Sequence, residues 1–310
     1  MKRKKLIIGT RSSKLALWQA NYIAECIRNQ YPEVEVSILH IMTTGDKILD
    51  VPLAKIGGKG LFTKELEIAM LAGDIDLAVH SLKDMPTELP MGLLLAAITE
   101  RVDPGDALIS PKYGSIDNLP QGAKVGTSSL RRKAQLLKYR PDLTISDLRG
   151  NLDTRLKKMD TEELDAIILA VAGLKRLGWQ DLITQILPKD ICLPAVGQGA
   201  LAIEARTDDL EVRTMLEFIN HQQTRWAVEA ERAYLAEVEG GCQIPIGVYG
   251  YIEQELLVLE AAILSVDGKQ QIRQTISGQP SEGIQLGRTL AQQMLDCGGR
   301  EILKELEITN

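Results

Sequence analysis

The sequence predicts an α/β fold with two doubly wound domains around a cleft, followed by a C-terminal α+β domain with an antiparallel sheet. In the first two thirds of the chain, short apolar runs alternate with segments of helical periodicity, which is typical of β/α units. The run over 166–171 is apolar at every position and indicates a parallel sheet that is covered on both faces. In the last third, strand patterns follow one another without helices between them, as in an antiparallel sheet.

The first β/α series occupies about the first hundred residues. A short apolar run at 6–8 predicts a buried strand, and the hydroxyl of Ser12 or Ser13 can cap the helix that follows, to about residue 29. The alternation over 34–38 predicts a second strand. The remaining elements predicted in this series are a helix over 62–71 and strands over 74–80 and 93–98.

A second β/α series follows the Asp-Pro-Gly breaker at 103–105, where we expect the chain to cross between domains. Apolar runs and helical patterns alternate through this series as they do in the first. The predicted elements are strands over 124–126, 143–148 and 166–171 and helices over 130–138 and 152–159.

The α+β domain begins near Asn220. Alternating apolar and polar residues predict three strands in succession, and Asp267-Gly268 is a favourable hairpin turn between the second and the third. Helical patterns end the chain. The predicted elements are strands over 248–252, 256–263 and 271–277 and helices over 281–296 and 300–307.

The composition excludes several classes of function. The 310 residues hold 36 Lys and Arg against 42 Asp and Glu, a net charge of −6, which argues against general binding to nucleic acid or anionic membranes. The three His and four Cys show no metal-site spacing, so we expect no metal. Scattered Cys residues, without a signal-peptide core or a long apolar stretch, favour a cytoplasmic protein.

Two similar turns occupy equivalent places in the two series. Residues 9–13 (GTRSS) and 126–132 (GTSSLRR) each follow a predicted strand and open a predicted helix. A helix N-terminus offers unpaired N–H groups to an anion, and Arg and hydroxyl side chains strengthen such a site. An ordinary N-cap would explain one such turn, whereas two matching turns favour anion binding. Ligands bind at the carboxyl ends of strands in such sheets, so facing domains would bring both turns into one cleft.

Six Arg residues occupy the ligand-side junctions of the predicted sheets. A solvated helix face is the usual place for Arg, but an acidic protein with six of them at such junctions is expected to bind a polycarboxylate or a polyphosphate. The planar, bidentate guanidinium group suits carboxylates well. The six residues are Arg11, Arg131, Arg132, Arg149, Arg155 and Arg176.

A Gly-rich segment at 56–63 (IGGKGLFT) resembles a phosphate-binding loop without satisfying its pattern. Gly60 stands where GxxxxGK[ST] requires Ser or Thr directly after the Lys. Lys55 and Lys59 therefore belong either to a mobile loop that covers an anionic ligand or to a plain flexible loop, and the sequence does not decide between them.

An acid and a thiol complete the candidates. Asp84 follows the predicted strand 74–80 and is either a catalytic carboxylate or a helix-capping residue before Pro86. Cys242 lies between two Gly and a Pro in EGGCQIPIG, on a loop between a helix and a strand. It is either an accessible nucleophile or attachment point, or an inert buried thiol.

Taken together, these segments make the chain resemble the porphobilinogen deaminase family over essentially its whole length. Each motif alone is weak, whereas eight of them in order are highly specific. The motifs are GTRSSKLALWQA from Gly9, LAKIGGKGLFTKELE from Leu53, DLAVHSLKDMP from Asp76, VGTSSLRRKAQL from Val125, DLRGNLDTRL from Asp147, AIILAVAGLKRLG from Ala166, LPAVGQGALAIE from Leu193 and EGGCQIPIG from Glu239.

The resemblance implies an enzyme that deaminates porphobilinogen and joins four units head to tail into the linear tetrapyrrole hydroxymethylbilane, in haem and chlorophyll biosynthesis. It implies that the product grows on a dipyrromethane cofactor held through a thioether to Cys242, and that Asp84 stabilises the cationic azafulvene formed when ammonia leaves. The six Arg match carboxylate-binding positions, and Lys55 and Lys59 match the mobile loop. Polar positions around cofactor and substrate match Ser13, Ser81, Lys83, Thr127 and Ser129.

The resemblance also implies the domain bounds and the setting of the enzyme. Because the family fold returns the segment near 200–217 to the first domain, the expected domains are 1–99 with 200–217, 100–199, and 218–310 with the Cys242 loop. We expect a cytoplasmic monomer that binds porphobilinogen, binds neither nucleic acid nor membrane, and hands its product to the next enzyme of the pathway.

Two alternatives stay open from the residues alone. Two doubly wound domains around an anion cleft also resemble the lobes of periplasmic binding proteins, so a solute-binding or effector-sensing protein has the same architecture. A nucleotide-dependent enzyme that uses Lys59 is a third interpretation, which the incomplete phosphate-loop pattern weakens. A covalent adduct mass would distinguish the three, because only the transferase carries one.

Overall fold

The chain divides into two compact units. The computed structural model describes residues 3–47, 60–238 and 244–309. One unit comprises Met1–Val102 with Ala200–Arg225, and the other comprises Asp103–Gly199 with Trp226–Asn310. Among the described residues, no helix is long and apolar enough to cross a membrane. The finer division into three domains, with the bounds given above, stays a prediction.

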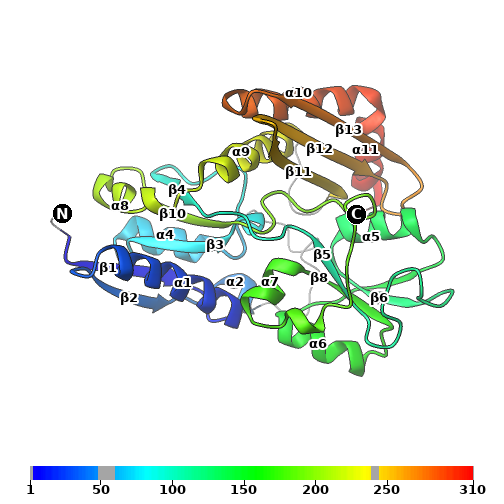
Figure 1. Ribbon diagram of the computed structural model, residues 1–310, viewed down its shortest axis with the longest axis horizontal. Helices are drawn as coiled ribbons and strands as arrows, with labels where there is room; N and C mark the ends of the chain where they lie inside the picture. Colours follow the sequence, from blue (N-terminus) through cyan, green and yellow to red (C-terminus); the bar gives the residue numbers. More distant parts are fainter. Residues whose placement is uncertain (1–2, 48–59, 239–243, 310) are drawn as a thin grey trace. The chain divides into compact units, whose positions relative to one another are not determined.

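The first unit contains a five-stranded sheet with the order β2-β1-β3-β10-β4 (Figure 1). β1, β2 and β3 are parallel neighbours, whereas β10 is antiparallel to both β3 and β4. The expectation of a parallel sheet is therefore wrong here, because β10 begins beside Ser81 at the carboxyl end of β3 and runs back along it. The strands are β1 (Lys5–Thr10), β2 (Glu35–His40), β3 (Leu77–Ser81), β4 (Leu93–Ile98) and β10 (Leu201–Arg206).

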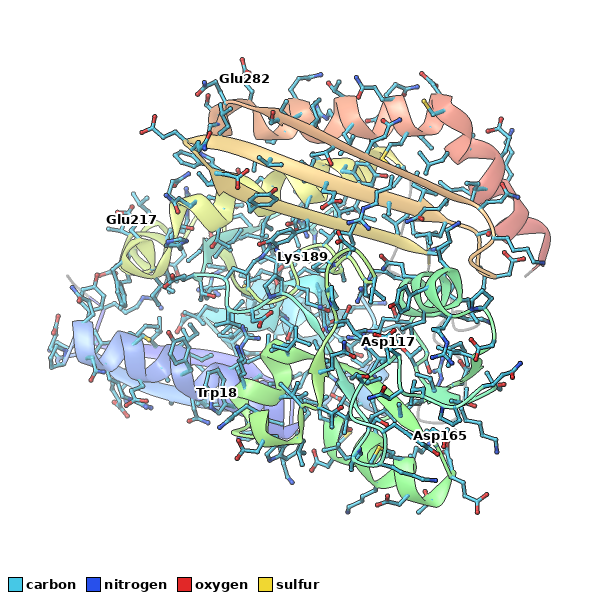
Figure 2. All side chains as sticks on the ribbon, turned by 45° about the vertical axis from the view of Figure 1, so that its right-hand side comes forward. Trp18, Asp117, Asp165, Lys189, Glu217 and Glu282 are labelled. Atoms are coloured by element: carbon cyan, nitrogen blue, oxygen red, sulfur yellow. The ribbon has the colours of Figure 1, made fainter. Side chains whose placement is uncertain are left out.

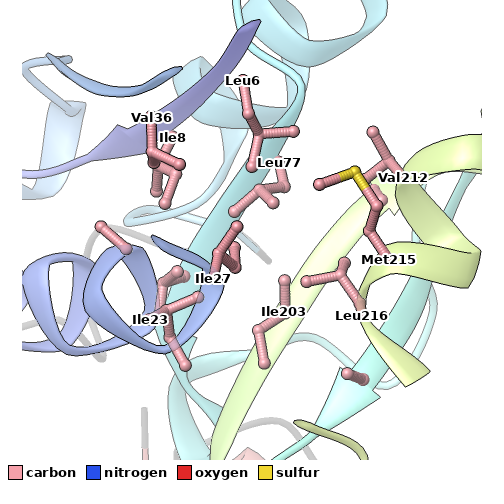
Figure 3. Packing of buried hydrophobic residues seen from close by; sticks show 14 of the residues in the cluster. Leu6, Ile8, Ile23, Ile27, Val36, Leu77, Ile203, Val212, Met215 and Leu216 are labelled. Atoms are coloured by element: carbon pink, nitrogen blue, oxygen red, sulfur yellow. The ribbon is translucent and has the colours of Figure 1, made fainter. Parts of the chain in front are cut away.

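Helices cover both faces of this sheet. Ile23 and Ile27 of α1 pack against Leu77 of β3 on one face (Figure 3). On the other face, α4 packs Met70 against Ala78, since neighbouring strand residues point to opposite faces. Each fully buried Ile or Leu contributes about 1.5–3 kcal/mol to folding. The helices are α1 (Lys14–Gln30), α2 (Thr44–Lys47), α4 (Lys64–Ala72) and α8 (Leu210–Met215), with short 3₁₀ turns at Leu82–Asp84 and Glu217–Ile219.

The second unit contains a sheet with the corresponding order β7-β6-β8-β5-β9. β6, β7 and β8 are parallel, and β5 is antiparallel to β8 and β9, so this sheet is also mixed. The pattern analysis did not identify β5 or β9, because one follows an Asp-Pro-Gly breaker and the other has two residues. The strands are β5 (Asp106–Ile109), β6 (Lys124–Gly126), β7 (Thr144–Ser146), β8 (Ala166–Ala170) and β9 (Gln185–Ile186).

Short helices follow the parallel strands of this sheet. At the amino ends of the strands, Asp165 accepts a hydrogen bond of 2.8 Å from the backbone N–H of Lys124 (Asp165 is labelled in Figure 2), which ties the start of β8 to that of β6. The helices therefore all begin at the opposite, carboxyl edge. They are α5 (Leu130–Tyr139), α6 (Leu152–Thr161) and α7 (Val171–Arg176), with a 3₁₀ turn at Gln180–Leu182.

The C-terminal part of the second unit is a three-stranded antiparallel sheet, β11-β12-β13, and the C-terminal helices α9 and α10 pack on one of its faces (Figure 1). This confirms the predicted α+β segment and its antiparallel sheet. Residues 295–299, with Gly298 at φ +105°, interrupt the helical course between α10 and α11. The elements are α9 (Gln222–Glu237), β11 (Ile246–Glu253), β12 (Leu256–Leu264), β13 (Gln271–Gly278), a 3₁₀ turn (Pro280–Glu282), α10 (Gly283–Met294) and α11 (Arg300–Thr309).

The turn between β12 and β13 lies against helix α5. Ala134 of α5 shares a buried cluster with Ala262 and Leu264 of β12. Gly268 adopts φ +74°, and a Cβ there would lie 2.5 Å from the backbone nitrogen of Lys138. Glycine is needed at this turn for two reasons, the left-handed backbone and the close approach of α5. The antiparallel sheet thus supports the helix that begins with the second predicted anion-binding turn.

Replacing Gly268 with Ala should lower the thermal midpoint more than replacing Gly178 with Ala. Both glycines have positive φ, +74° and +72°, so both variants share a backbone strain of about 1 kcal/mol. A methyl on Gly178 meets no atom within 4 Å, whereas one on Gly268 collides with the α5 backbone. Thermal unfolding followed by circular dichroism measures the difference. Equal losses in the two variants would contradict the close approach.

Candidate active site

In the first unit, two loops leave the same edge of the sheet. Because β1 and β3 are parallel neighbours, with Gly9 opposite Ala78, both strands end on one side. The Nε2 group of Gln19 on α1 donates a hydrogen bond of 2.8 Å to the hydroxyl of Ser81, which ties the helix to the end of β3. The predicted site residues that this edge brings together are Arg11, Ser13, Ser81, Lys83 and Asp84.

Arg11 is held by an acid and an aromatic ring. Its Nε donates to Asp46 at 3.1 Å, and its guanidinium carbon lies 4.2 Å from the centre of the Phe62 ring. Burial alone would raise the pKa of Asp46, but hydrogen bonds from Arg11 and Thr43 outweigh burial and lower it. Asp46 is therefore an ionised counter-ion, and a ligand carboxylate would compete with it for Arg11.

Ser13 caps α1 as predicted. Its hydroxyl accepts a hydrogen bond of 3.3 Å from the backbone N–H of Ala16. This bond satisfies one of the unpaired donors of the first helical turn, while the other N–H groups stay directed toward the edge.

Asp84 ends a single 3₁₀ turn that directly follows β3. Backbone hydrogen bonds fix this turn. The N–H of Leu82 donates to the carbonyl of Ala200 at 3.1 Å, and the N–H of Met85 donates to the carbonyl of Leu82 at 3.1 Å. The side chain of Asp84 is exposed, and no helix begins in the residues after it, so it is not a helix cap. A fixed backbone with an exposed carboxylate at a strand end is a favourable arrangement for chemistry on a bound ligand.

A buried pair lies directly behind this edge, and the pattern analysis did not single it out. His80 of β3 and Glu204 of β10 are both buried, with 3.1 Å between Nε2 and Oε2. Burial raises the pKa of the neighbouring Glu67, and the charge of Glu204 raises it further. This pair fixes the residue before Ser81 against the adjacent strand.

In the second unit, three loops leave one edge of the sheet. Gly126 lies opposite Ser146 and Ile167, so β6, β7 and β8 end on the same side. The hydroxyl of Ser129 caps α5 by accepting from the N–H of Arg132 at 3.4 Å. The predicted site residues that follow these strands are Thr127, Ser129, Arg131, Arg132, Arg149, Arg155 and Arg176.

Arg131 and Arg132 are buried rather than exposed, and both contact Asp106. Arg131 Nη1 donates to Asp106 Oδ2 at 2.6 Å, and Arg132 donates to Asp106 Oδ1 through Nη2 at 2.7 Å. Burial alone would raise the pKa of Asp106, but the two guanidinium charges hold that pKa far below its usual range. Asp106 is a residue that sequence reasoning missed, although an acid at the start of an otherwise apolar strand was a signal for it.

The other three Arg residues are each positioned by backbone carbonyl groups or by further contacts. Arg155 Nε donates to the carbonyl of Gly150 at 2.7 Å, where φ is +108°. Arg176 Nη2 donates to the carbonyl of Gly199 at 2.7 Å. Arg149 also interacts with a neighbouring group. The carbonyl contacts fix the orientation of the Arg155 and Arg176 guanidinium groups.

The thiols differ in their surroundings. Cys192 is buried, its Sγ lies 3.3 Å from Asp106, and burial raises its pKa to about 12. Cys297 is exposed, and Cys26 is partly buried. Three predicted site residues, Cys242, Lys55 and Lys59, lie outside the described residues. Within the described ranges, no group of three or more His, Cys, Asp and Glu residues is arranged to hold a metal ion.

Comparison with known proteins gives consistent results over the whole chain. A model of the porphobilinogen deaminase dipyromethane cofactor binding domain matches residues 6–214, and a model of the C-terminal domain of porphobilinogen deaminase matches 226–296. The porphobilinogen deaminase of Geotalea uraniireducens is 56% identical over 306 residues, covering 99% of this chain and 96% of that protein. That of Desulforamulus reducens is 51% identical over 304 residues, covering 98% of each.

Solved structures match less closely. The periplasmic aliphatic sulphonate binding protein SsuA from Escherichia coli is 16% identical with a TM-score of 0.42, covering 77% of this chain and 71% of that one. The BvgS VFT2 domain from Bordetella pertussis is 12% identical with a TM-score of 0.41, covering 69% and 85%.

Cys192 should resist alkylation at pH 8 under conditions in which Cys297 reacts. Because its pKa is raised to about 12, only on the order of one Cys192 thiol in ten thousand is ionised at pH 8. Iodoacetamide labelling of the native protein followed by peptide mass mapping measures both sites, and the same reaction in urea is the control, in which both should react. Equal labelling of the two thiols in the native protein would contradict the burial of Cys192.

Proposed function

The chain belongs to the porphobilinogen deaminase family, and we propose that it joins four porphobilinogen units head to tail into hydroxymethylbilane, with Asp84 as its catalytic carboxylate and Cys242 as its cofactor attachment point. The chain is a porphobilinogen deaminase with a dipyrromethane cofactor-binding domain, and it acts in tetrapyrrole biosynthesis. The observation that carries the proposed site is the gathering of guanidinium groups, hydroxyls and one exposed carboxylate at two sheet edges.

The ligand chemistry fits these edges. Each porphobilinogen ring carries an acetate and a propionate, so the growing product accumulates carboxylates. Arg11 and Arg149 lie in the loops after β1 and β7, Arg155 lies in the first half of α6, and Arg176 is the last residue of α7. Guanidinium groups bind carboxylates through paired hydrogen bonds. Further donors at these edges are the hydroxyl groups of Thr127, Ser129 and Ser13 and the backbone N–H groups at the N-termini of the helices.

The donor set also fits the dipyrromethane cofactor. The polar groups at the second edge are guanidinium, hydroxyl and amide donors, which suit its acidic side chains, and Arg131 and Arg132 are buried with more positive than negative charge around them. When bound, this group supplies the pyrrole ring to which the first substrate is joined. The residues that we propose hold it are Arg131, Arg132, Arg149, Arg155, Thr127 and Ser129, with Cys242 as the covalent anchor.

Asp84 has the properties that deamination requires. Loss of ammonia from an electron-rich pyrrole leaves a delocalised positive charge, and a fixed carboxylate stabilises that charge as it develops. The 3₁₀ turn holds the Asp84 backbone while its side chain stays exposed. The carboxylate oxygens of Asp84 can also accept a hydrogen bond from the pyrrole N–H, which orients the ring. In this proposal Lys83 on the same turn and Ser81 at the end of β3 bind the substrate beside Asp84.

Cys242, which lies outside the described residues, is the thiol that matches the family's cofactor-attachment position in EGGCQIPIG from Glu239. Of the other thiols, Cys192 is buried with a raised pKa, Cys26 is partly buried on α1, and Cys297 lies in the break before α11. In the proposed enzyme the Lys55 and Lys59 loop covers the bound carboxylates. The enzyme works as a cytoplasmic monomer and hands its product to the next enzyme of the pathway.

The purified protein should be heavier than its sequence mass by one dipyrromethane. Because we propose a thioether, the extra mass should survive denaturation and map to the peptide that contains Cys242. Intact and peptide mass spectrometry of protein from cells that make porphobilinogen measures it, and Cys242→Ser is the matched variant, expected at its bare mass. An unmodified mass for the wild-type protein would contradict the proposed thioether attachment of the cofactor to Cys242.

Asp84→Asn should reduce turnover of porphobilinogen by at least about a hundredfold, since removing one stabilising group from a transition state costs roughly that factor. The thermal midpoint should stay close to the wild-type value, because the side chain is exposed. Asp84→Glu, which keeps the charge, should retain more activity than Asp84→Asn. Near-normal turnover in Asp84→Asn would refute the catalytic role.

A further inference from the structure

A buried cluster of charges lies at the start of β5 and the first turn of α5. Asp106 is 0% exposed, and Arg131 and Arg132 are each 5% exposed. Both oxygens of the carboxylate are used, because Oδ2 accepts from Arg131 at 2.6 Å and Oδ1 accepts from Nε and Nη2 of Arg132 at 3.0 and 2.7 Å. The acid therefore contacts both guanidinium groups at once.

The cluster holds each of these groups from more than one side. Arg131 Nη1 also donates to the carbonyl of Leu193 at 2.6 Å, and Arg132 Nη1 donates to the carbonyl of Ile168 at 3.0 Å. Gln198 Nε2 donates to Asp106 Oδ1 at 3.0 Å. Because the carboxylate and both guanidinium planes are fixed in this way, a shift of Asp106 would move both Arg side chains.

Among the residues that the structure describes, the charges in the cluster do not cancel. Two guanidinium groups and one carboxylate give a net charge of +1, since the Cys192 thiol beside them is neutral, with a pKa raised to about 12 by burial, and the amides of Gln135 and Gln198 carry no charge. An uncompensated charge in a nearly dry site is unfavourable. One anionic group from a ligand would neutralise the remaining positive charge.

We propose that Asp106 is a positioning residue that fixes Arg131 and Arg132 and leaves them one positive charge, so that this pair of guanidinium groups binds a single carboxylate of the cofactor or substrate. Without Asp106 the pair would carry two uncompensated charges and would repel each other. The inference rests on the proposed function, because it takes the ligand carboxylates from there. It assigns Asp106 no contact with the reacting atoms.

Two substitutions test this role. Asp106→Asn removes the fixed anion, and Asp106→Glu keeps the charge but displaces the guanidinium groups by one methylene. Intact mass spectrometry of Asp106→Asn should show a lower fraction of protein that carries the cofactor, or kinetics of the cofactor-loaded fraction should show a higher KM for porphobilinogen. We expect a change of about tenfold in either quantity, because that is the factor for losing one charge-assisted hydrogen bond. Asp106→Glu should show the same change to a smaller extent, with kcat less affected than KM.

Asp165→Asn is the matched control, since Asp165 lies in the same unit at the opposite ends of the strands and accepts from a backbone N–H. It should leave occupancy and KM unchanged. A merely structural role of Asp106 predicts lower thermal midpoints with wild-type occupancy and KM in both variants, and that result overturns the proposal. If Asp106→Asn does not fold, wild-type occupancy and KM in Asp106→Glu overturn it equally.

The wild-type protein separates this inference from the proposed function. If the wild type lacks the dipyrromethane mass or does not consume porphobilinogen, the proposed function fails and the ligand carboxylates assumed here fail with it. If the wild type has both and the Asp106 variants match it in occupancy and KM, only the positioning role of Asp106 fails.

Discussion

The parallel register of three strands in each sheet is the constraint on which the rest of the molecule depends. β1 lies between β2 and β3, and β6 lies between β7 and β8, so in each unit the loops after three strands leave one edge. Residues that are far apart in the sequence, such as Arg11 and Asp84, therefore meet at one edge. The hydroxyl caps of Ser13 and Ser129 then start a helix at the same place in each sheet.

Electrostatics explains how an acidic chain can bind acidic ligands. The net charge of −6 is a sum over the whole chain and says little about any one edge. At the edges the structure pairs some Arg residues with acids, as in Arg11 with Asp46, and holds others with neutral carbonyls, as in Arg155 and Arg176. The charge that each guanidinium group leaves for a ligand depends on its own neighbours, so the local arrangement matters more for binding than the net charge of the chain.

Much of the fold could be predicted from periodicity, because strands such as β8 are apolar throughout and helices such as α1 carry a clear cap. The direction of β10 could not be predicted from the sequence pattern. The pairing of a strand depends on how distant parts of the chain come together, and the local pattern of apolar residues carries no information on that. The burial of Arg131 and Arg132 was also hidden, because the sequence shows two basic residues at a helix start but not the acid of β5 that faces them. Asp106 is 25 residues from Arg131, and only the sheet brings them together.

The same strand order in the two sheets conceals a difference in how each is completed. The second sheet draws all its strands from one continuous stretch. In the first sheet, β4 lies at the edge and pairs only with β10, which is made about a hundred residues later. During synthesis on the ribosome, β4 therefore has no strand to pair with until the middle of the chain has emerged. The sheet that is begun first is finished second, and a truncated chain ending before residue 201 would leave a gap between β3 and β4.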